Sequence, residues 1–252
     1  MLKRFLNATL GLAGLKAIRA GSLHFGPDAI PYGVDMWADI ARLAGSEPIR
    51  TVLDIGANVG NFSINAVRRN PGLTIYAFEP IADTFGKLKT AAADYPNIKP
   101  FPLACGPERG RRTIPLYQSH EMNTLAAAPA DGEMSGKQTG AAEIEIETVD
   151  EFCKQQRIER IDLLKTDAEG YDLEVLHGAK TMLAAGAIRF VYSEFYRLSQ
   201  PGSTSGTLID LANYLAPFGY KFVTTYTDYV VPEKDYFGVH NALFARATRP
   251  GK

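Results

Sequence analysis

From residue 50 onward, short apolar runs rich in β-branched residues alternate with segments that have the pattern of helices. Apolar strands that alternate with helices are typical of a parallel sheet with both faces covered. Because crossovers between parallel strands are right-handed, such a chain folds into a doubly wound α/β sheet. The pattern predicts strands at residues 50–55, 73–79, 98–104, 161–166, 188–193, 220–226 and 241–246, and helices at 61–70, 81–93, 173–185 and 207–216.

Composition narrows the class of protein further. The chain has 252 residues, enough for one large α/β domain whose core needs no disulfides. Its 27 basic and 28 acidic residues nearly cancel, which argues against a dedicated nucleic-acid binder. Cys105 and Cys153 are too far apart for a Cys-x-x-Cys metal pair, and no apolar run approaches the ~20 residues of a membrane span. We therefore expect a cytoplasmic protein with no nucleic-acid partner and no stable membrane insertion.

The first 47 residues precede the alternating pattern. Two basic residues followed by the apolar residues 5–15 resemble the start of a signal peptide. However, Asn7 and Thr9 interrupt the apolar part, and no clean small-residue cleavage site follows. We expect residues 1–47 to form a helical N-terminal extension and residues 48–252 to form the main domain.

Residues 118–142 also depart from the alternation. They are rich in Ala, Gly, Ser and Thr and contain few large apolar side chains, so they cannot bury enough surface to form a core element. We expect a long loop here. Loops of this length are commonly lids or binding loops, and a plain surface loop is the alternative.

A glycine-rich turn, Asp54-Ile-Gly-Ala-Asn-Val-Gly60, separates the first predicted strand from its helix. Gly56 lets the backbone bend sharply and approach a ligand, and Gly60 lets the start of the helix pack closely. The free N–H groups of the first helical turn point into the crevice at the carboxyl ends of the strands, where open α/β sheets bind ligands. The sequence therefore predicts a ligand site at this turn.

Glu79 is the second part of this signal, since it ends the second predicted strand 19 residues after Gly60. A carboxylate at this spacing accepts hydrogen bonds from both vicinal hydroxyls of a ribose. The glycines do not match the Gly-x-Gly-x-x-Gly fingerprint of dinucleotide sites, and Asp54 suits a cationic amino-acid group better than a pyrophosphate. S-adenosylmethionine combines such a group with a ribose and a sulfonium, so the turn points to a methyl donor.

Four motifs together resemble the FkbM family of S-adenosylmethionine-dependent methyltransferases: Asp54-x-Gly-Ala-Asn-x-Gly60, Phe78-Glu-Pro80, Ile161-Asp-Leu-Leu-Lys-Thr-Asp-Ala-Glu-Gly170 and Val175-Leu-x-Gly-Ala179. The resemblance covers about residues 48–246. It implies a Rossmann-like methyltransferase fold, with a seven-stranded sheet whose last strand runs antiparallel, and O-methylation of sugars or secondary metabolites. Where family members often have Ser-Ser-Leu after the third strand, this chain has Asn-Thr-Leu at 123–125.

The turn and the resemblance together predict that residues 48–252 form a methyltransferase domain. The expected methyl donor is S-adenosylmethionine, and the expected product is S-adenosylhomocysteine. The acceptor is expected to be a small molecule or glycan with a free hydroxyl. The residues expected to bind the donor are Asp54, Gly56, Ala57, Asn58, Gly60, Glu79 and Pro80.

The candidates for catalysis lie at the ends of the later strands. Period two puts Lys165 and Asp167 on one face of the fourth strand. A lysine inside an apolar strand needs a partner, either Asp167 or Glu194 at the end of the fifth strand. If the last strand is antiparallel, its start brings His240 to the same edge, and a histidine can take a proton from a hydroxyl at neutral pH. The sequence thus predicts catalytic roles for Lys165, Asp167, Glu194 and His240.

Two alternatives stay open. Asp167, Glu194 and His240 are residue types that bind Mg²⁺, which would make the protein a metal-dependent small-molecule O-methyltransferase. We favour a site without a metal. The second alternative is a nucleoside-binding module of the same fold that has lost catalysis, and the acids at Asp54, Glu79, Asp167 and Glu194 argue against it.

Overall fold

The computed structural model describes residues 16–19, 22–24, 30–117, 138–196, 207–231 and 237–246. The chain divides into two units, which are described separately. One unit comprises Met1–Pro48 with Thr224–Tyr226, and the other comprises Ile49–Val223 with Thr227–Lys252. The division at residues 47 and 48 into an extension and a methyltransferase domain stays a prediction.

The smaller unit contains a hairpin of two antiparallel strands, β1 (Lys16–Arg19) and β2 (Ser22–His24), and the helix α2 (Met36–Ala44). Asp35 caps α2 by accepting the backbone N–H groups of its first turn. The prediction of a helical extension is therefore correct for α2 and wrong for the described residues of 16–24, which pair as strands.

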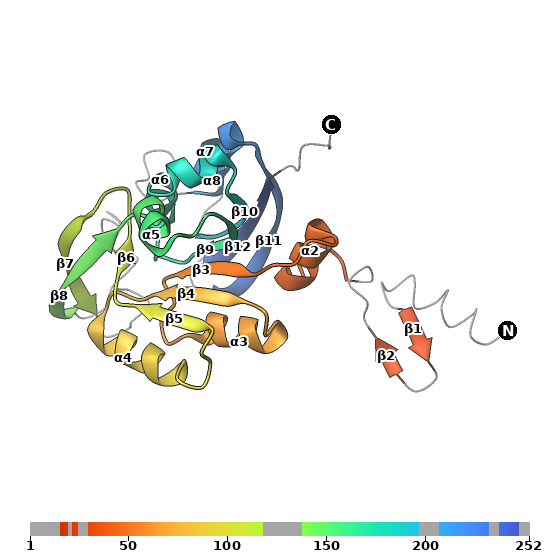
Figure 1. Ribbon diagram of the computed structural model, residues 1–252, viewed down its shortest axis with the longest axis horizontal. Helices are drawn as coiled ribbons and strands as arrows, with labels where there is room; N and C mark the ends of the chain where they lie inside the picture. Colours follow the sequence, from red (N-terminus) through yellow and green to blue (C-terminus); the bar gives the residue numbers. More distant parts are fainter. Residues whose placement is uncertain are drawn as a thin grey trace. The chain divides into compact units, whose positions relative to one another are not determined.

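The larger unit is built on a seven-stranded sheet with the order β11-β12-β10-β9-β3-β4-β5 (Figure 1). The strand β12 runs antiparallel to β10, whereas β10, β9, β3, β4 and β5 pair in parallel. This topology confirms the predicted doubly wound sheet with an antiparallel last strand. The strands are β3 (Thr51–Ile55), β4 (Thr74–Phe78), β5 (Ile98–Phe101), β9 (Ile161–Thr166), β10 (Ile188–Phe195), β11 (Tyr220–Val231) and β12 (Phe237–Arg246).

Helices lie on both sides of this sheet, with α3 and α4 on one side and α5 to α8 on the other (Figure 1). The main core lies on the second side, where Leu53 and Phe78 of the sheet pack with Phe152 of α5 and Val175 of α6. No helix in the described part of the chain is long and apolar enough to cross a membrane. The helices are α3 (Asn61–Arg69), α4 (Ala82–Ala91), α5 (Val149–Gln156), α6 (Asp172–His177), α7 (Lys180–Ala185) and α8 (Leu208–Leu215).

A second sheet was not predicted. It has three strands, β6 (Ala104–Cys105), β7 (Gly110–Tyr117) and β8 (Gln138–Glu147). The predicted loop 118–142 is therefore wrong for residues 138–142, which pair with β7, and residues 118–137 lie outside the described part of the chain. The signal for β8 is the alternation of Glu and Ile in its second half, at residues 143–147.

Two predicted elements are each divided. The predicted strand 98–104 ends at Phe101, and its last residue belongs to β6 of the second sheet. The predicted helix 173–185 is split at Gly178 into α6 and α7. A Cβ on Gly178 would lie 2.0 Å from the carbonyl oxygen of Gly106, so only glycine allows the second sheet to approach the helix this closely.

Phe152 gives a test of the core. Its ring contacts those of Phe78 at 4.6 Å and Phe101 at 4.9 Å, measured between centroids. We expect Phe152→Ala to lower the free energy of unfolding by about 3–5 kcal/mol, because it removes a buried ring and leaves a cavity. Urea unfolding measures this. The matched control Ile209→Ala, at a 49 % exposed position on α8, should change stability by less than about 0.5 kcal/mol.

Candidate active site

The turn after β3 is bent by left-handed residues. Gly56 has φ = 75°, and a Cβ there would lie 1.8 Å from the carbonyl oxygen of Asp167. Gly60 has φ = 93° and is the residue that precedes α3. The N–H groups of Gly56 and Ala57 donate to the carbonyl of Phe78 at 3.1 and 2.8 Å, which ties the turn to the end of β4. The turn thus has the sharp bend that the glycines predict.

Glu79 directly follows β4 and lies beside this turn. One of its oxygens accepts the N–H of Asn58 at 3.2 Å, and the other accepts the N–H of Ile81 at 2.9 Å. Glu79 is only 6 % exposed, and this burial raises its pKa to about 7 even though both backbone hydrogen bonds act to lower it. Since a carboxylate oxygen accepts more than one hydrogen bond, Glu79 retains acceptor capacity for ribose hydroxyls.

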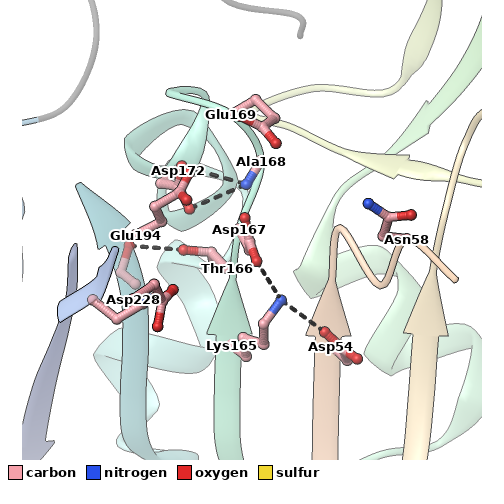
Figure 2. Close-up of polar contacts among 12 residues, drawn as sticks. Asp54, Asn58, Lys165, Thr166, Asp167, Ala168, Glu169, Asp172, Glu194 and Asp228 are labelled. Atoms are coloured by element: carbon pink, nitrogen blue, oxygen red, sulfur yellow. Dashed lines mark hydrogen bonds and ion pairs between the residues drawn. The ribbon is translucent and has the colours of Figure 1, made fainter. Parts of the chain in front are cut away.

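Lys165 lies between Asp54, near the end of β3, and Asp167, in the turn after β9 (Figure 2). Its Nζ is 3.0 Å from Oδ1 of Asp54 on β3 and 3.1 Å from Oδ2 of Asp167, the residue after β9. The pair with Asp167 confirms one of the two partners that the sequence predicts. Burial alone would lower the pKa of Lys165, but the charges of Asp167 and Asp54 outweigh it and raise that pKa above its usual range.

Asp54 and Asp167 differ in exposure. The Asp54 side chain is fully buried, and its second oxygen accepts the hydroxyl of Ser63 at 2.7 Å. Direct contact between Asp54 and the amino group of the donor stays a prediction that this burial does not favour. The Asp167 side chain is 34 % exposed and is therefore the acid of this ion-pair cluster that a ligand can reach.

The strand register sorts the other candidates onto two faces of the sheet. In the strand register, Asp54 of β3 lies opposite Lys165 of β9, and Glu194 of β10 lies opposite Asn241 of β12. These side chains share the face of the sheet that α3 covers, from which Ser63 donates to Asp54. His240 pairs with Phe195 and so lies on the opposite face. Its ring stacks on Phe195 at 5.5 Å, and its Nδ1 is 3.1 Å from Thr227 Oγ1.

The structure therefore brings together only part of the predicted catalytic cluster. Lys165, Asp167 and Glu194 interact electrostatically, since the charge of Asp167 raises the pKa of Glu194. The contacts of His240 in the described part of the chain are with Thr227 and Phe195, on the other face. A catalytic role for His240 stays a prediction that its position in β12 does not favour.

Sequence reasoning missed two acids near this edge, the buried Asp172 and the exposed Asp228. Asp172, at the start of α6, is 2 % exposed and accepts the N–H of Ala168. Burial raises the pKa of Asp172 to about 7, while a hydrogen bond from Thr166 acts to lower it. Asp228 on β11 accepts the side-chain amide of Asn241 at 2.7 Å, and partial desolvation raises its pKa too. The sequence gives little reason to assign these two acids to the site, because isolated acidic residues also occur on solvated surfaces.

Tyr196 and Glu169 are also part of the site. The phenol oxygen of Tyr196 lies 2.7 Å from Oε2 of Glu169 and 2.8 Å from Oε2 of Glu194. Burial raises the pKa of Glu194 well above its usual value, and the charges of Asp167, Asp172 and Glu169 raise it further.

A doubly wound sheet with an antiparallel last strand, a glycine turn after β3 and an acid after β4 define a Rossmann-like methyltransferase. The family model described as methyltransferase FkbM domain matches residues 54–222, more than half of the chain. The chain belongs to the FkbM methyltransferase family, which confirms the resemblance found in the sequence. This family uses S-adenosylmethionine, which is therefore the methyl donor.

Two of the curated relatives are named for the position or the acceptor that they methylate. The 2-O-methyltransferase NoeI of Sinorhizobium fredii is 22 % identical over 160 residues, which cover 59 % of this chain and 64 % of NoeI. The hexuronic acid methyltransferase AglP of Haloferax volcanii is 29 % identical over 161 residues, covering 63 % of this chain and 62 % of AglP. The chain spans less than two thirds of the length of the curated relatives it matches.

Solved structures also align with the chain. The structure of TrmK from M. capricolum with S-adenosylhomocysteine aligns with a TM-score of 0.48 and 11 % identity, over 88 % of this chain and 73 % of that one.

The residues of the turn fit this donor. Gly56 and Ala57 leave the bend without bulky side chains, and Asn58 presents an exposed side chain next to the acceptor oxygens of Glu79. A carboxylate suits ribose hydroxyls and repels a phosphate. Gly56, Ala57, Asn58, Gly60, Glu79 and Pro80 thus lie at one edge of the sheet, and their direct contact with the donor stays a prediction.

Glu79 allows a test of the donor site. We expect Glu79→Ala to weaken the binding of S-adenosylhomocysteine by about 1–3 kcal/mol, because the ribose hydroxyls lose a charged acceptor. Calorimetry on the folded variant measures this difference. Asp94→Ala, which removes an exposed acid beyond α4, is the control and should retain the wild-type affinity.

The raised pKa of Glu79 adds a dependence on pH. Below about pH 7 the carboxyl is protonated, and binding that needs the charged form must first remove this proton. The affinity of the wild type should therefore fall by up to about tenfold for each pH unit below 7. Glu79→Gln should bind with the same affinity across this range. A wild-type affinity that does not change with pH would place the ribose contact elsewhere.

Proposed function

We propose that this protein transfers a methyl group from S-adenosylmethionine to a hydroxyl oxygen of a sugar, a glycan or a secondary metabolite. The observation that carries the proposal is Asp167, a partly exposed carboxylate at the carboxyl edge of the sheet, held by the buried Lys165. The 2-O-methyltransferase activity of NoeI and the hexuronic acid methyltransferase activity of AglP, both matched at low identity, support an oxygen acceptor on a carbohydrate.

The bound donor supplies a methyl group on a positively charged sulfur, which is already activated for in-line displacement. The acceptor oxygen forms the new C–O bond as the C–S bond breaks, and the hydroxyl proton must leave. Asp167 is the base in this proposal: one of its oxygens contacts Lys165, and its exposed surface receives the proton. Orienting the two reactants supplies much of the rate, and a general base adds about 10²–10⁴-fold.

Lys165 positions this base. Its ammonium group fixes the side chain of Asp167, because the same ammonium also contacts the buried Asp54. Lys165 itself is 5 % exposed, so it acts on the acceptor through Asp167. We propose no nucleic-acid acceptor, given the net charge of −1, and we keep the cytoplasm as the expected location.

A screen of hydroxylated acceptors with labelled donor tests this function. We expect transfer of label to at least one sugar or glycan, and Asp167→Asn should lower kcat about 10²–10⁴-fold because the amide cannot take up a proton. The affinity for S-adenosylhomocysteine should stay within a few fold of wild type. Asp94→Asn, an exposed acid away from the strand ends, serves as the control and should keep full activity.

Two results would count against this assignment. A screen without any product would favour a nucleoside-binding module of the same fold. An equal loss of donor affinity and of kcat in Asp167→Asn would make Asp167 a donor ligand.

Removing divalent ions separates the proposal from metal-dependent methylation. We expect enzyme treated with a chelator and then desalted to keep its activity, because proton transfer to Asp167 needs no Lewis acid. The measurement is kcat before and after treatment, with Mg²⁺ added back. A loss of activity that only Mg²⁺ or Mn²⁺ restores would make these acids metal ligands.

A further inference from the structure

Tyr196 joins two carboxyl groups from different parts of the chain. Its phenol oxygen is 2.7 Å from Glu169, in the turn between β9 and α6, and 2.8 Å from Glu194, near the end of β10. Both distances are those of strong O–H···O hydrogen bonds. Two such bonds need two hydrogen atoms, and a phenol has one. The second hydrogen must belong to one of the two carboxyl groups.

Glu194 is the carboxyl group that its surroundings favour for this hydrogen. It is 5 % exposed, and the acids Asp167, Asp172 and Glu169 all oppose its ionisation. Lys165, the cation on this face, contacts Asp54 and Asp167. The titratable groups that face Glu194 are Asp167, Glu169, Asp172, Tyr192 and Tyr196. Its partner on β12, Asn241, is neutral and donates to Asp228 of β11, the further acid on this face.

We propose that Glu194 is a protonated carboxylic acid that donates to Tyr196, which in turn donates to Glu169, and that this chain positions the turn carrying Asp167. Each short contact then contains one hydrogen. Glu194 is accordingly a positioning residue and not a base, since a group that already holds its proton cannot accept one from the acceptor hydroxyl.

The turn between β9 and α6 has a strained backbone that a hydrogen bond from Tyr196 can stabilise. Glu169 has φ = 52° and Gly170 has φ = 85°, so two successive residues are left-handed, and the first has a side chain. A non-glycine residue in this region costs about 1–3 kcal/mol and persists only when its surroundings hold it. The hydrogen bond from Tyr196 holds Glu169 two residues after Asp167. The effect on catalysis rests on the proposed O-methylation, whereas the protonation of Glu194 does not.

Stability as a function of pH tests the protonation without any acceptor. A buried acid that keeps its proton in the folded state and loses it in the unfolded state favours unfolding as pH rises. Relative to Glu194→Gln, the wild-type folding equilibrium constant should therefore fall about tenfold for each pH unit above about 5 until Glu194 ionises. Urea unfolding of both proteins at a series of pH values measures this ratio.

Glu147 offers a matched control for this experiment. It is also 5 % exposed, but it lies 3.2 Å from the guanidinium of Arg109 and accepts the amide of Gln155 at 3.1 Å. Glu147→Gln should therefore show no growing advantage over wild type as pH rises. If Glu194→Gln and wild type keep a constant stability difference across the range, Glu194 is ionised and the proposal is wrong.

Infrared spectroscopy of wild type and Tyr196→Phe tests the chain even if Glu194→Gln does not fold. With ¹³C-labelled glutamate, a protonated Glu194 gives a C=O stretching band of a carboxylic acid at neutral pH. In Tyr196→Phe this band should shift, since the acid loses its hydrogen-bond acceptor. A spectrum in which Tyr196→Phe leaves all glutamic acid bands unchanged would overturn the proposal.

Activity toward an acceptor from the screen then tests the positioning role. We expect Glu194→Ala to lower kcat at least tenfold with little change in the KM for the donor, and Glu194→Gln to restore kcat to within a few fold of wild type, because its amide also donates to Tyr196. Failure of Glu194→Gln to restore kcat would contradict the positioning role. A screen without product would refute the proposed function and leave the stability and infrared results to decide on the proton.

Discussion

The buried ammonium group of Lys165 is the interaction on which both halves of the site depend. A lone charge inside a sheet is strongly unfavourable, and removal of one partner from a buried pair costs about 3–5 kcal/mol. Here the partners are Asp54 on β3, before the glycine turn, and Asp167, at the start of the turn between β9 and α6. The same two segments also meet through their backbones, since the N–H of Asp167 donates to Ile55 at 3.1 Å. The glycine turn and the turn between β9 and α6 are thus fixed to each other by charge and by backbone.

This arrangement divides the acids at the sheet edge into two groups. Asp54 and Asp167 contact the ammonium group of Lys165 directly. Glu79, Asp172 and Glu194 lie in buried positions where desolvation dominates, and their pKa values are raised. Asp167 is the partly exposed acid of the lysine cluster, and in the proposed function it accepts the proton that the reaction releases. The buried acids serve as hydrogen-bond partners for the surrounding backbone and side chains.

Most of the main sheet and the glycine turn with Glu79 could be predicted, because the sequence patterns that indicate them are local. Apolar runs predict the strands of a parallel sheet, and the glycine turn with Glu79 predicts the donor edge before any fold is known. The three-stranded sheet was missed because β8 begins with Gln138, Thr139 and Gly140, which have no apolar alternation. Its pairing with β7 depends on residues distant in sequence.

The catalytic cluster was harder to predict because it depends on register. Lys165 and Asp167 share a face within one strand, so period two is sufficient to pair them. The position of His240 depends on how β12 pairs with β10, and a shift of one residue would move it to the other face. Tyr196 lies beyond the end of β10, where strand periodicity no longer predicts direction. Its partner Glu169 comes from a turn whose shape no local motif revealed.

The two turns at the site resemble each other in how they hold a strained residue. Asn58 in the glycine turn after β3 has φ = 49°, and Glu169 in the turn between β9 and α6 has φ = 52°. Each is held by a group at the end of a different strand: Glu79 after β4 accepts the N–H of Asn58, and Tyr196 after β10 donates to Glu169. Strain of this kind persists only where neighbouring elements oppose its release. A shift of β4 or β10 would therefore be transmitted to the backbone of these turns, so the sheet determines the geometry of both.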